Sequence, residues 1–422
     1  MNSGPITRII AEAELLVILA IGPALLFPTP SRLLVLMVVP VLAYSAWVTY
    51  GTVIPRTPLN VSLGSLLIMV MISTTTTFDI LFSLDKISGV ILGVLVFWAV
   101  VRWTTSPAKL ATITAVFLLA GAVLSVLGLL GTHHGQYEHP DSWASHWRVV
   151  IPPIRGAENG FNPNAVAGCL VLFLPLQIAL FFFSPRWWER WSQVEARGNW
   201  GSRVQGALLV VSSVTLVAMQ SRGALLGVGL VSAVALLAFS RGARILAALA
   251  LGVIILGSVM LGPRAIARDV FDWAGPAMEQ TVTIRLSIWS RAIVGIQDFP
   301  WAGMGMNVAR TVLPVTPPRI ETAHAHNHLL QAALDLGIPG LIAYMSIWAV
   351  VAVLLARVWL RSRQIEYRVA AAGLAAGLTA HFIFGMTDAI PLGSKVGVLF
   401  WLTLALTVSL YQIAIGGKKR LR

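Results

Sequence analysis

The segment 338–360, "IPGLIAYMSIWAVVAVLLARVWL", decides the class of fold. It carries one charged side chain, Arg357, and a helix that rises about 1.5 Å per residue over this length crosses the ~30 Å hydrocarbon core of a bilayer. Similar runs recur along the chain, in which 57% of the residues are hydrophobic and 11% are charged. Soluble domains carry about 25% charged residues, so the sequence predicts an all-α polytopic membrane protein.

The apolar runs predict about 12 transmembrane helices. The run 205–240 is too long for one span and is interrupted by "QSRG" at 220–223, so we expect two helices that meet at Arg222. The run 61–73 is short but uncharged and counts as a further span. The other runs long enough to span a bilayer lie near 9–28, 33–50, 88–104, 109–130, 163–184, 244–262, 338–360, 368–386 and 390–415. The run at 9–28 is read as a retained span and not as a removed signal.

The basic residues predict how the chain is oriented. An even number of spans places both termini on one side, and the tail "KKRLR" at 418–422 marks that side as cytoplasmic. The loops assigned to this side hold Arg56, Arg102, Lys109, Arg186, Arg190, Arg197, Arg203, Arg241, Arg244, Arg361, Arg363 and Arg368, whereas the opposite loops hold few, among them Arg32, Lys86 and Arg222. The net charge of +13 is therefore explained by membrane topology, and no nucleic-acid partner is expected.

This topology predicts three regions. Residues 1–262 form helices 1–9 with an external loop at 131–162, residues 263–337 form a large external loop, and residues 338–422 form helices 10–12 and the basic tail. Connections this long are usually functional. Within the large loop, an amphipathic helix is expected at 282–297 and Arg285 is expected to open it; its apolar residues are Ile284, Ile288, Trp289, Ala292, Ile293 and Ile296.

Two arginines on the external face are candidates for binding an anion. Arg222 closes a tight turn between two apolar helices, and a charge at membrane depth costs about 2.5–3.5 kcal/mol unless it has a partner or snorkels to the interface. The predicted topology places Arg285 on the same face of the membrane. The alternative for Arg285 is an exposed charge on the polar face of its helix, without a ligand. Because arginine pairs bidentately with phosphate oxygens, the two together suit a pyrophosphate group.

Three alternating histidines, His324, His326 and His328, precede an apolar helix in "TAHAHNHLLQAALDLGIPG" at 322–340. Asn327 is expected to cap that helix and Gly337 to end it. Histidine ordinarily has a pKa near ~6.5, which suits a general base, and His326 stands at the helix entrance.

A metal site is the alternative for these histidines. Imidazoles at alternate positions line one face of a strand but diverge on a helix, and no carboxylate cluster accompanies them in the sequence. The single cysteine, Cys169, rules out a disulfide within the chain and a thiolate zinc site. We therefore expect no metal and no cofactor.

The segments "IRLSIWSRAIVGIQDFPWAGMGMNVAR" at 284–310 and "HAHNHLLQAALDLGIPGLIAY" at 324–344 resemble the core signature of the bacterial O-antigen ligase family, within a wider group of lipid-linked oligosaccharide ligases and polymerases. "QSRGALLG" at 220–227 and "NPNAVAG" at 162–168 are similar to two further motifs of the family. The matching signature residues are Arg285 and Trp289; Pro300, Gly303 and Gly305 of a Pro-x-x-Gly-x-Gly turn; and His326, Asn327 and Gly337.

The resemblance implies a GT-C-like glycosyltransferase of the bacterial inner membrane, with its active site on the periplasmic face and both termini cytoplasmic. The enzyme would transfer O-antigen from undecaprenyl pyrophosphate to the lipid A-core oligosaccharide without a metal. Membrane lipids would surround it. His326 would be the general base in an inverting displacement, and Arg222 and Arg285 would hold the pyrophosphate. The substrate-binding residues that it implies are Arg222, Arg285, Asn327, Asp388 and Trp289, of which Asp388 would orient His326 or an arginine.

Other functions remain open at this stage. An O-antigen polymerase and a protein O-oligosaccharyltransferase use the same kind of donor with a different acceptor. A transporter or flippase for lipid-linked glycan is a different class, which requires ionisable residues deep in the spans. The chief candidates for such residues, Glu12, Glu14 and His381, lie near span ends, which favours an enzyme.

Overall fold

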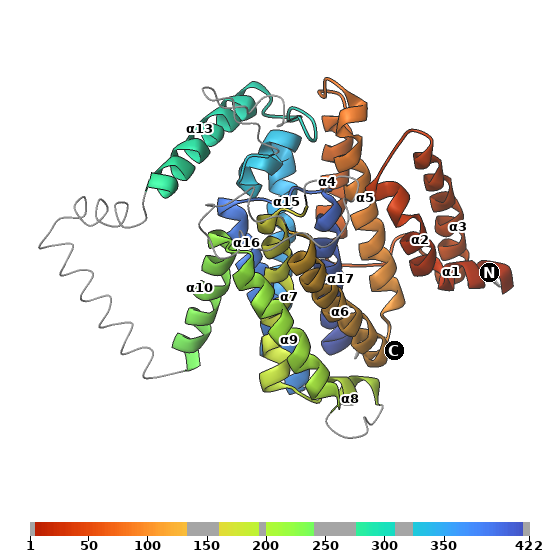
Figure 1. Ribbon diagram of the computed structural model, residues 1–422. Helices are drawn as coiled ribbons and strands as arrows, with labels where there is room; N and C mark the ends of the chain where they lie inside the picture. The colour runs from red at the N-terminus through yellow and green to blue at the C-terminus, as the bar shows by residue number, and fades with distance from the viewer. Residues whose placement is uncertain (1–4, 133–159, 194–199, 240–275, 309–323, 417–422) are drawn as a thin grey trace, which may run out of the picture.

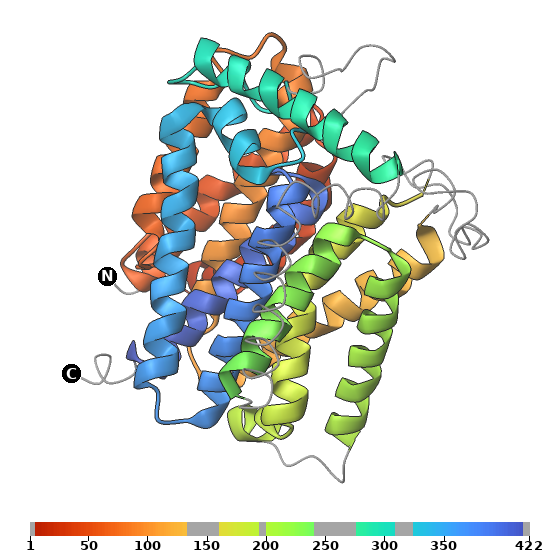
Figure 2. The same cartoon turned by 90° about the vertical axis from the view of Figure 1, so that its left-hand side faces the viewer.

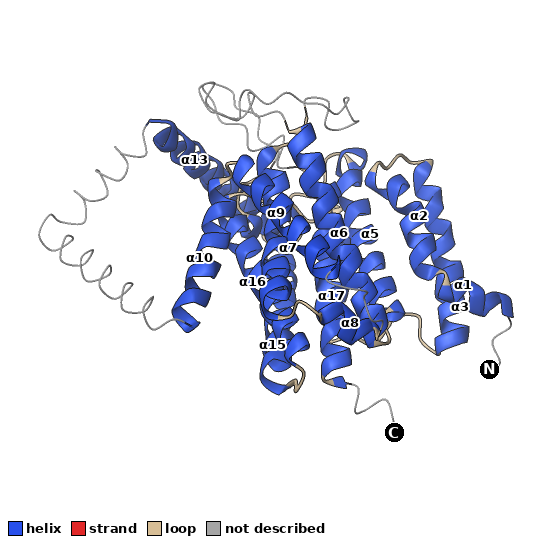
Figure 3. Cartoon of the chain, turned by 60° about the horizontal axis from the view of Figure 1, so that its bottom comes forward, coloured by secondary structure: helices blue, strands red, loops and turns tan. Residues whose placement is uncertain are grey.

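The computed structural model describes residues 5–132, 160–193, 200–239, 276–308 and 324–416 (Figure 1). Within these ranges the chain is helical and contains no strand (Figure 3). The α-helices are α1 (Pro5–Glu12), α2 (Glu14–Leu26), α3 (Val38–Tyr50), α4 (Asn60–Ser73), α5 (Ile80–Trp103), α6 (Pro107–Gly131), α7 (Pro163–Phe183), α8 (Trp187–Ser192), α9 (Trp200–Ala218), α10 (Arg222–Phe239), α13 (Pro276–Asp298), α15 (His328–Arg361), α16 (Ile365–Thr387) and α17 (Val398–Ala414), with 3₁₀ turns η1 (Arg32–Met37) and η4 (Lys395–Gly397).

The protein is a polytopic helical membrane protein. Among the described residues, eight helices are long and apolar enough to cross a membrane, and α1 with α2 forms a ninth candidate that is bent by 56°. Two predicted spans, at 61–73 and after Arg222, appear as shorter apolar helices. The predicted span at 244–262 lies outside the described residues, so the total of about 12 stays a prediction.

Two helix starts differ from those predicted. α5 begins at Ile80 and not near residue 88, because the Asp79 side chain caps it by accepting from the Leu81 N–H at 2.8 Å. α15 begins at His328, as predicted for the helix capped by Asn327, and it continues across a kink at Gly337 into the predicted span at 338. α13 begins at Pro276, so the prediction that Arg285 opens this helix is wrong. Apolar spacing locates the buried face of a helix, whereas its first residue depends on capping and on residues such as proline that tolerate the first turn.

The packing of the helices gathers several helix termini at one end of the bundle. α16 packs extensively against α7 and α10, and α13 packs on α15. Figures 1 and 2 show α13 lying across the end of the bundle where α15 begins. Ile288 and Ala292 of α13 form a small buried cluster with Ala325 and Leu334. The starts of α7, α10 and α15 therefore meet the end of α16 beneath α13.

A break in α15 receives the Pro-x-x-Gly-x-Gly turn. Gly337 has φ 71° and ψ 179°, which interrupts the helix. The Leu334 carbonyl then accepts from the Met304 N–H at 2.8 Å, and the Ile338 N–H donates to the Pro300 carbonyl at 2.7 Å. The turn thus satisfies backbone groups that the break leaves without partners in the helix.

Two glycines allow this close approach. A Cβ on Gly303 would lie 2.5 Å from the backbone of Asp335, and a Cβ on Gly337 would lie 2.7 Å from the backbone of Trp301. Both glycines also have positive φ, a region that L-residues with side chains disfavour. The glycine spacing of the signature therefore reflects backbone-to-backbone packing between the turn and α15.

Candidate functional site

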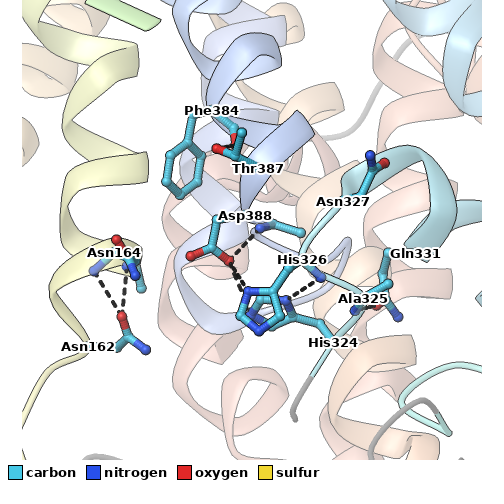
Figure 4. A network of polar contacts seen from close by, with 12 residues as sticks. Asn162, Asn164, His324, Ala325, His326, Asn327, Gln331, Phe384, Thr387 and Asp388 are labelled. Atoms are coloured by element: carbon cyan, nitrogen blue, oxygen red, sulfur yellow. Dashed lines mark hydrogen bonds and ion pairs between the residues drawn. The ribbon is translucent and has the colours of Figure 1, made fainter. Parts of the chain in front are cut away.

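A histidine–carboxylate pair lies at the end of the bundle covered by α13. Asp388 follows α16, and its Oδ1 lies 3.1 Å from Nδ1 of His326 (Figure 4). The same oxygen accepts from the Ala389 N–H at 2.7 Å. The Asp388 side chain is 8% exposed, whereas that of His326 is 30% exposed. The carboxylate is therefore buried behind an imidazole that still reaches solvent.

His324 is the second imidazole on this carboxylate. Its Nε2 lies 3.6 Å from Asp388 Oδ1, and its Nδ1 accepts from the His326 backbone N–H at 3.2 Å. A neutral imidazole has one proton. The proton of His324 is therefore on Nε2, facing Asp388, and that of His326 is on Nδ1, which leaves Nε2 of His326 as the proton acceptor.

The two histidines keep Asp388 ionised. Burial by itself would raise the pKa of the Asp388 carboxyl. The hydrogen bond with His326, the charges of His324 and His326 and the N–H of Ala389 outweigh burial and lower that pKa below its ordinary value. Asp388 is therefore a carboxylate at neutral pH, and as a carboxylate it stabilises a positive charge on either imidazole.

The backbone of His326 adopts a conformation that only surrounding contacts can maintain. Its φ is 49°, in the left-handed region that costs a non-glycine residue about 1–3 kcal/mol. On its C-terminal side, Asn327 caps α15 as predicted: its side chain accepts from the Leu329 and Leu330 N–H groups at 2.9 and 3.1 Å. The Asn327 amide also donates to the Met386 carbonyl at 3.4 Å, which links this loop to α16.

The predicted signature tryptophan holds the other side of this loop. Trp289 projects from α13, and its indole N–H donates to the Ala325 carbonyl at 3.0 Å. This contact fixes the distance between α13 and the residue before His326. The substrate contact predicted for Trp289 stays a prediction, since its polar atom is engaged within the protein.

Arg222 and Arg285 come from two helices and act electrostatically on the same site. Arg222 is the exposed first residue of α10, as the predicted break at "QSRG" requires. Burial lowers the pKa of Arg285; Asp388 raises it and Arg222 lowers it. In the described ranges neither guanidinium forms an ion pair within 4.0 Å. Since arginine remains protonated at neutral pH, the site holds two cations beside one carboxylate.

A metal ion fits this cluster poorly. Ligand atoms of His324, His326 and Asp388 lie within 4.8 Å of one another, so one carboxylate, at the end of α16, accompanies the histidines in space. However, Nδ1 of His324 accepts a backbone N–H. The proton is thus on Nε2, the atom that faces Asp388, and a protonated nitrogen cannot be a ligand.

No specific role was assigned from the sequence to the remaining histidine or to a polar pair on the same helix. His328 is buried, and its Nδ1 lies 2.9 Å from the Tyr344 hydroxyl. Gln331 and Asp335, both buried on α15, were read only as part of an apolar helix. Their spacing of four residues on that helix was the available signal, because side chains at i and i+4 meet.

The fold and the site together define a membrane-embedded protein whose polar centre is suited to proton transfer on an anionic substrate. Residues 207–345 match the family model described as O-antigen ligase, so this segment of the chain is similar to that family. The resemblance based on the motifs is thereby confirmed. Members of this family are glycosyltransferase-like ligases and polymerases, which supports an enzymatic role in general.

The match covers about a third of the chain and includes every signature residue from Arg222 to Gly337. Asp388 lies beyond its end, so its place in the site comes from the tertiary structure. A search of the curated proteins found no match.

Proposed function

We propose that this protein is an O-antigen ligase, which transfers O-antigen polysaccharide from undecaprenyl pyrophosphate to the lipid A-core oligosaccharide. The observation that carries the proposal is the pair formed by His326 Nδ1 and Asp388 Oδ1 at 3.1 Å, which leaves Nε2 of His326 free to accept a proton. The proposal places the active site on the periplasmic face of the inner membrane, both termini in the cytoplasm, and the fold among GT-C-like transferases with about 12 spans.

In the proposed reaction, His326 Nε2 takes the proton of the acceptor hydroxyl. The oxygen then attacks the anomeric carbon of the donor sugar, and the bond from that carbon to the pyrophosphate oxygen breaks. The electron pair of the broken bond leaves with undecaprenyl pyrophosphate. A single displacement of this kind inverts the anomeric centre, and Asp388 stabilises the imidazolium that forms.

Arg222 and Arg285 would bind the pyrophosphate. Two guanidinium groups close enough to influence one another repel, and a cation at the first residue of α10 is also unfavourable with the dipole of that helix. An anion between the arginines removes both penalties, and the N–H groups at a helix start bind phosphate oxygens. These charges match the group that accumulates negative charge as the sugar leaves.

Transport is the less favoured function, because each candidate for a coupling residue has a structural partner. Glu14 pairs with Arg102 at 3.0 Å, and Glu12 pairs with Arg8 at 3.0 Å. Nδ1 of His381 lies 2.9 Å from the carbonyl oxygen of Gly168. These contacts account for the three candidate residues without a translocation path.

The test is glycan transfer by purified protein in vitro, with an undecaprenyl-linked glycan and one acceptor at a time. We expect product with lipid A-core, a loss of about 10²–10⁴-fold in His326→Ala, and unchanged rates with a chelator such as EDTA. Elution from a size-exclusion column and thermal unfolding of His326→Ala should match those of the wild type, which controls for correct folding.

Each alternative predicts another result. If product forms only with a second lipid-linked glycan as acceptor, the protein is a polymerase. If product forms only with a protein acceptor, it is a protein O-oligosaccharyltransferase. Full activity in His326→Ala would refute the assignment of the base. A strict requirement for added divalent ion would refute metal-independent transfer.

A further inference from the structure

Asp335 is a buried carboxyl group that the proposed reaction does not use. It lies in the first three turns of α15 and is 3% exposed. Gln331, one turn earlier, is 4% exposed. Buried polar groups inside a membrane protein are costly unless they are hydrogen-bonded and serve a purpose, so the pair calls for an explanation.

The two side chains form a chain of hydrogen bonds that ends beside His326. Asp335 Oδ1 accepts from Gln331 Nε2 at 2.9 Å. Gln331 Oε1 in turn accepts from the Ala325 backbone N–H at 2.7 Å. Figure 4 shows Gln331 beside Ala325 and His326. The side-chain carboxyl of Asp335 is therefore connected, through one amide, to the peptide group between His324 and Ala325, one residue before the proposed base.

The carboxylate determines which way the Gln331 amide points. A glutamine amide has a donor end and an acceptor end, and a carboxylate can only accept. With Nε2 facing Asp335, the oxygen must face the Ala325 N–H. The Ala325 carbonyl is held at the same time by Trp289 at 3.0 Å. The two peptide groups that flank Ala325 are thus each held by one of these hydrogen bonds.

We propose that Gln331 and Asp335 are positioning residues, which hold the backbone before His326 so that its imidazole keeps its place between Asp388 and the acceptor hydroxyl. The proposal rests on the proposed role of His326 as the base. The left-handed φ of His326, 49°, is the feature that requires such support, because a strained residue relaxes when its contacts are removed.

Other groups that face Asp335 bear on the test. Lys86 of α5 acts electrostatically on its carboxyl, and the backbone of Asn307 hydrogen-bonds with it. His328 lines the same small cavity. The hydrogen-bond chain from Asp335 through Gln331 to Ala325, which we call the relay, requires only a hydrogen-bond acceptor at position 335. A role for Asp335 as a charge or a proton carrier would instead require the carboxyl group itself. Substitutions at 331 and 335 separate these two roles.

Three variants are compared with the wild type by kcat, by KM for the undecaprenyl-linked donor and by pH profile. Gln331→Leu removes the relay, and we expect kcat to fall by roughly 10²-fold, the effect of misplacing a catalytic group by about 1 Å, with KM for the donor unchanged. Asp335→Asn still offers an oxygen to Gln331, so we expect most of the activity to remain.

Gln331→Glu supplies the most specific readout. Its carboxyl can accept from the Ala325 N–H, but it must share a proton with Asp335, since two adjacent carboxylates do not both ionise readily. The activity of this variant relative to wild type should therefore rise as the pH falls, whereas that of Gln331→Leu should not. Gln205→Leu, which removes a buried glutamine of α9, is the matched control and should keep its kcat.

Hydrogen exchange of the peptide that contains Ala325 reads the relay without any transferase assay. We expect faster exchange in Gln331→Leu than in wild type and in Gln205→Leu. Wild-type kcat in Gln331→Leu, or an inactive Asp335→Asn with no pH-dependent recovery in Gln331→Glu, would overturn the proposal. If Gln331→Leu fails to fold, the other two variants decide. If the wild type shows no glycan transfer but Gln331→Leu still exchanges faster at Ala325, the proposed function is refuted and the positioning of the backbone by Gln331 is not.

Discussion

Arg222 and Arg285 illustrate how far two side chains of one type differ in their surroundings. Arg222 is exposed at the start of α10, whereas Arg285 is partly buried on α13 and lies within the electrostatic influence of Asp388. Both are arginine and not lysine, which matters where a planar group must meet two phosphate oxygens. Their proposed role is therefore tested by a change of geometry at constant charge.

Arg222→Lys is expected to raise KM for the undecaprenyl-linked donor by roughly 10- to 100-fold, because a charge-assisted hydrogen bond is worth about 1.5–3 kcal/mol. The measurement is initial rate against donor concentration. Arg203→Lys, an exposed arginine in the first turns of α9 at the other end of the bundle, is the control and should leave KM unchanged. Equal KM values for the two variants would exclude Arg222 from the donor site.

Asp388→Asn is expected to change how stability depends on pH. The pKa of Asp388 is lowered by its two histidines after the opposing effect of burial. Its ionised form therefore stabilises the fold at a pH above the ordinary value near 3.9, and this contribution is lost as the pH falls through the lowered pKa. Thermal unfolding in detergent should show a gap between wild type and variant at pH 7 that narrows below pH ~4. A gap that widens on acidification would contradict this.

The break in α15 shows how two elements are joined by backbone contacts. α13 ends at Asp298, and the turn that follows it occupies the break at Gly337. This arrangement connects Arg285 and Trp289 on α13 to His326 at the start of α15. The signature glycines are thus needed for assembly of the site, not for chemistry.

Gly337→Ala is expected to destabilise this junction, because it adds a Cβ 2.7 Å from backbone atoms of Trp301 at a φ of 71°. The expected loss is about 1–3 kcal/mol, measured by thermal unfolding and accompanied by loss of transfer. Gly64→Ala in α4 is the matched control, since a Cβ there meets no atom within 4 Å. If both substitutions lowered Tm equally, the junction would have no special role.

The arrangement of the described helices places Arg222, Arg285 and His326 at one end of the bundle, while exposed Arg361 ends α15 and exposed Arg363 follows it at the other. Excess lysine and arginine on one side is typical of the cytoplasmic face. This distribution is the physical basis for proposing a periplasmic active site, in which donor and acceptor meet outside the cytoplasm.

Cysteine labelling in intact cells checks this orientation. Cys169 is buried and should contribute little background. With a membrane-impermeant maleimide, Ser290→Cys on the exposed surface of α13 should be labelled directly. Gln364→Cys, exposed between α15 and α16, should be labelled only after permeabilisation. The opposite pattern would reverse the proposed topology.

Interactions between residues close in the sequence were predictable. Hydropathy identified α6, α7 and α16, and the break before Arg222 followed from a polar tetrapeptide. Asn327 was predicted as the cap of α15 because a cap bonds to N–H groups only two or three residues away. The family signature likewise consists of short motifs, and it marked His326 and both arginines as candidate site residues.

Contacts between distant segments were decided by the tertiary structure. Asp388 reaches His326 across 62 residues, and Trp289 reaches Ala325 across 36. These distances depend on how α13 and α16 pack against α15, and hydropathy does not encode that packing, since many arrangements bury the same apolar surface. The sequence by itself therefore determined the membrane class, the local caps and the candidate site residues. The packing of the helices decided that Asp388, which the resemblance assigned to His326 or an arginine, contacts His326, and which amide lies beside it.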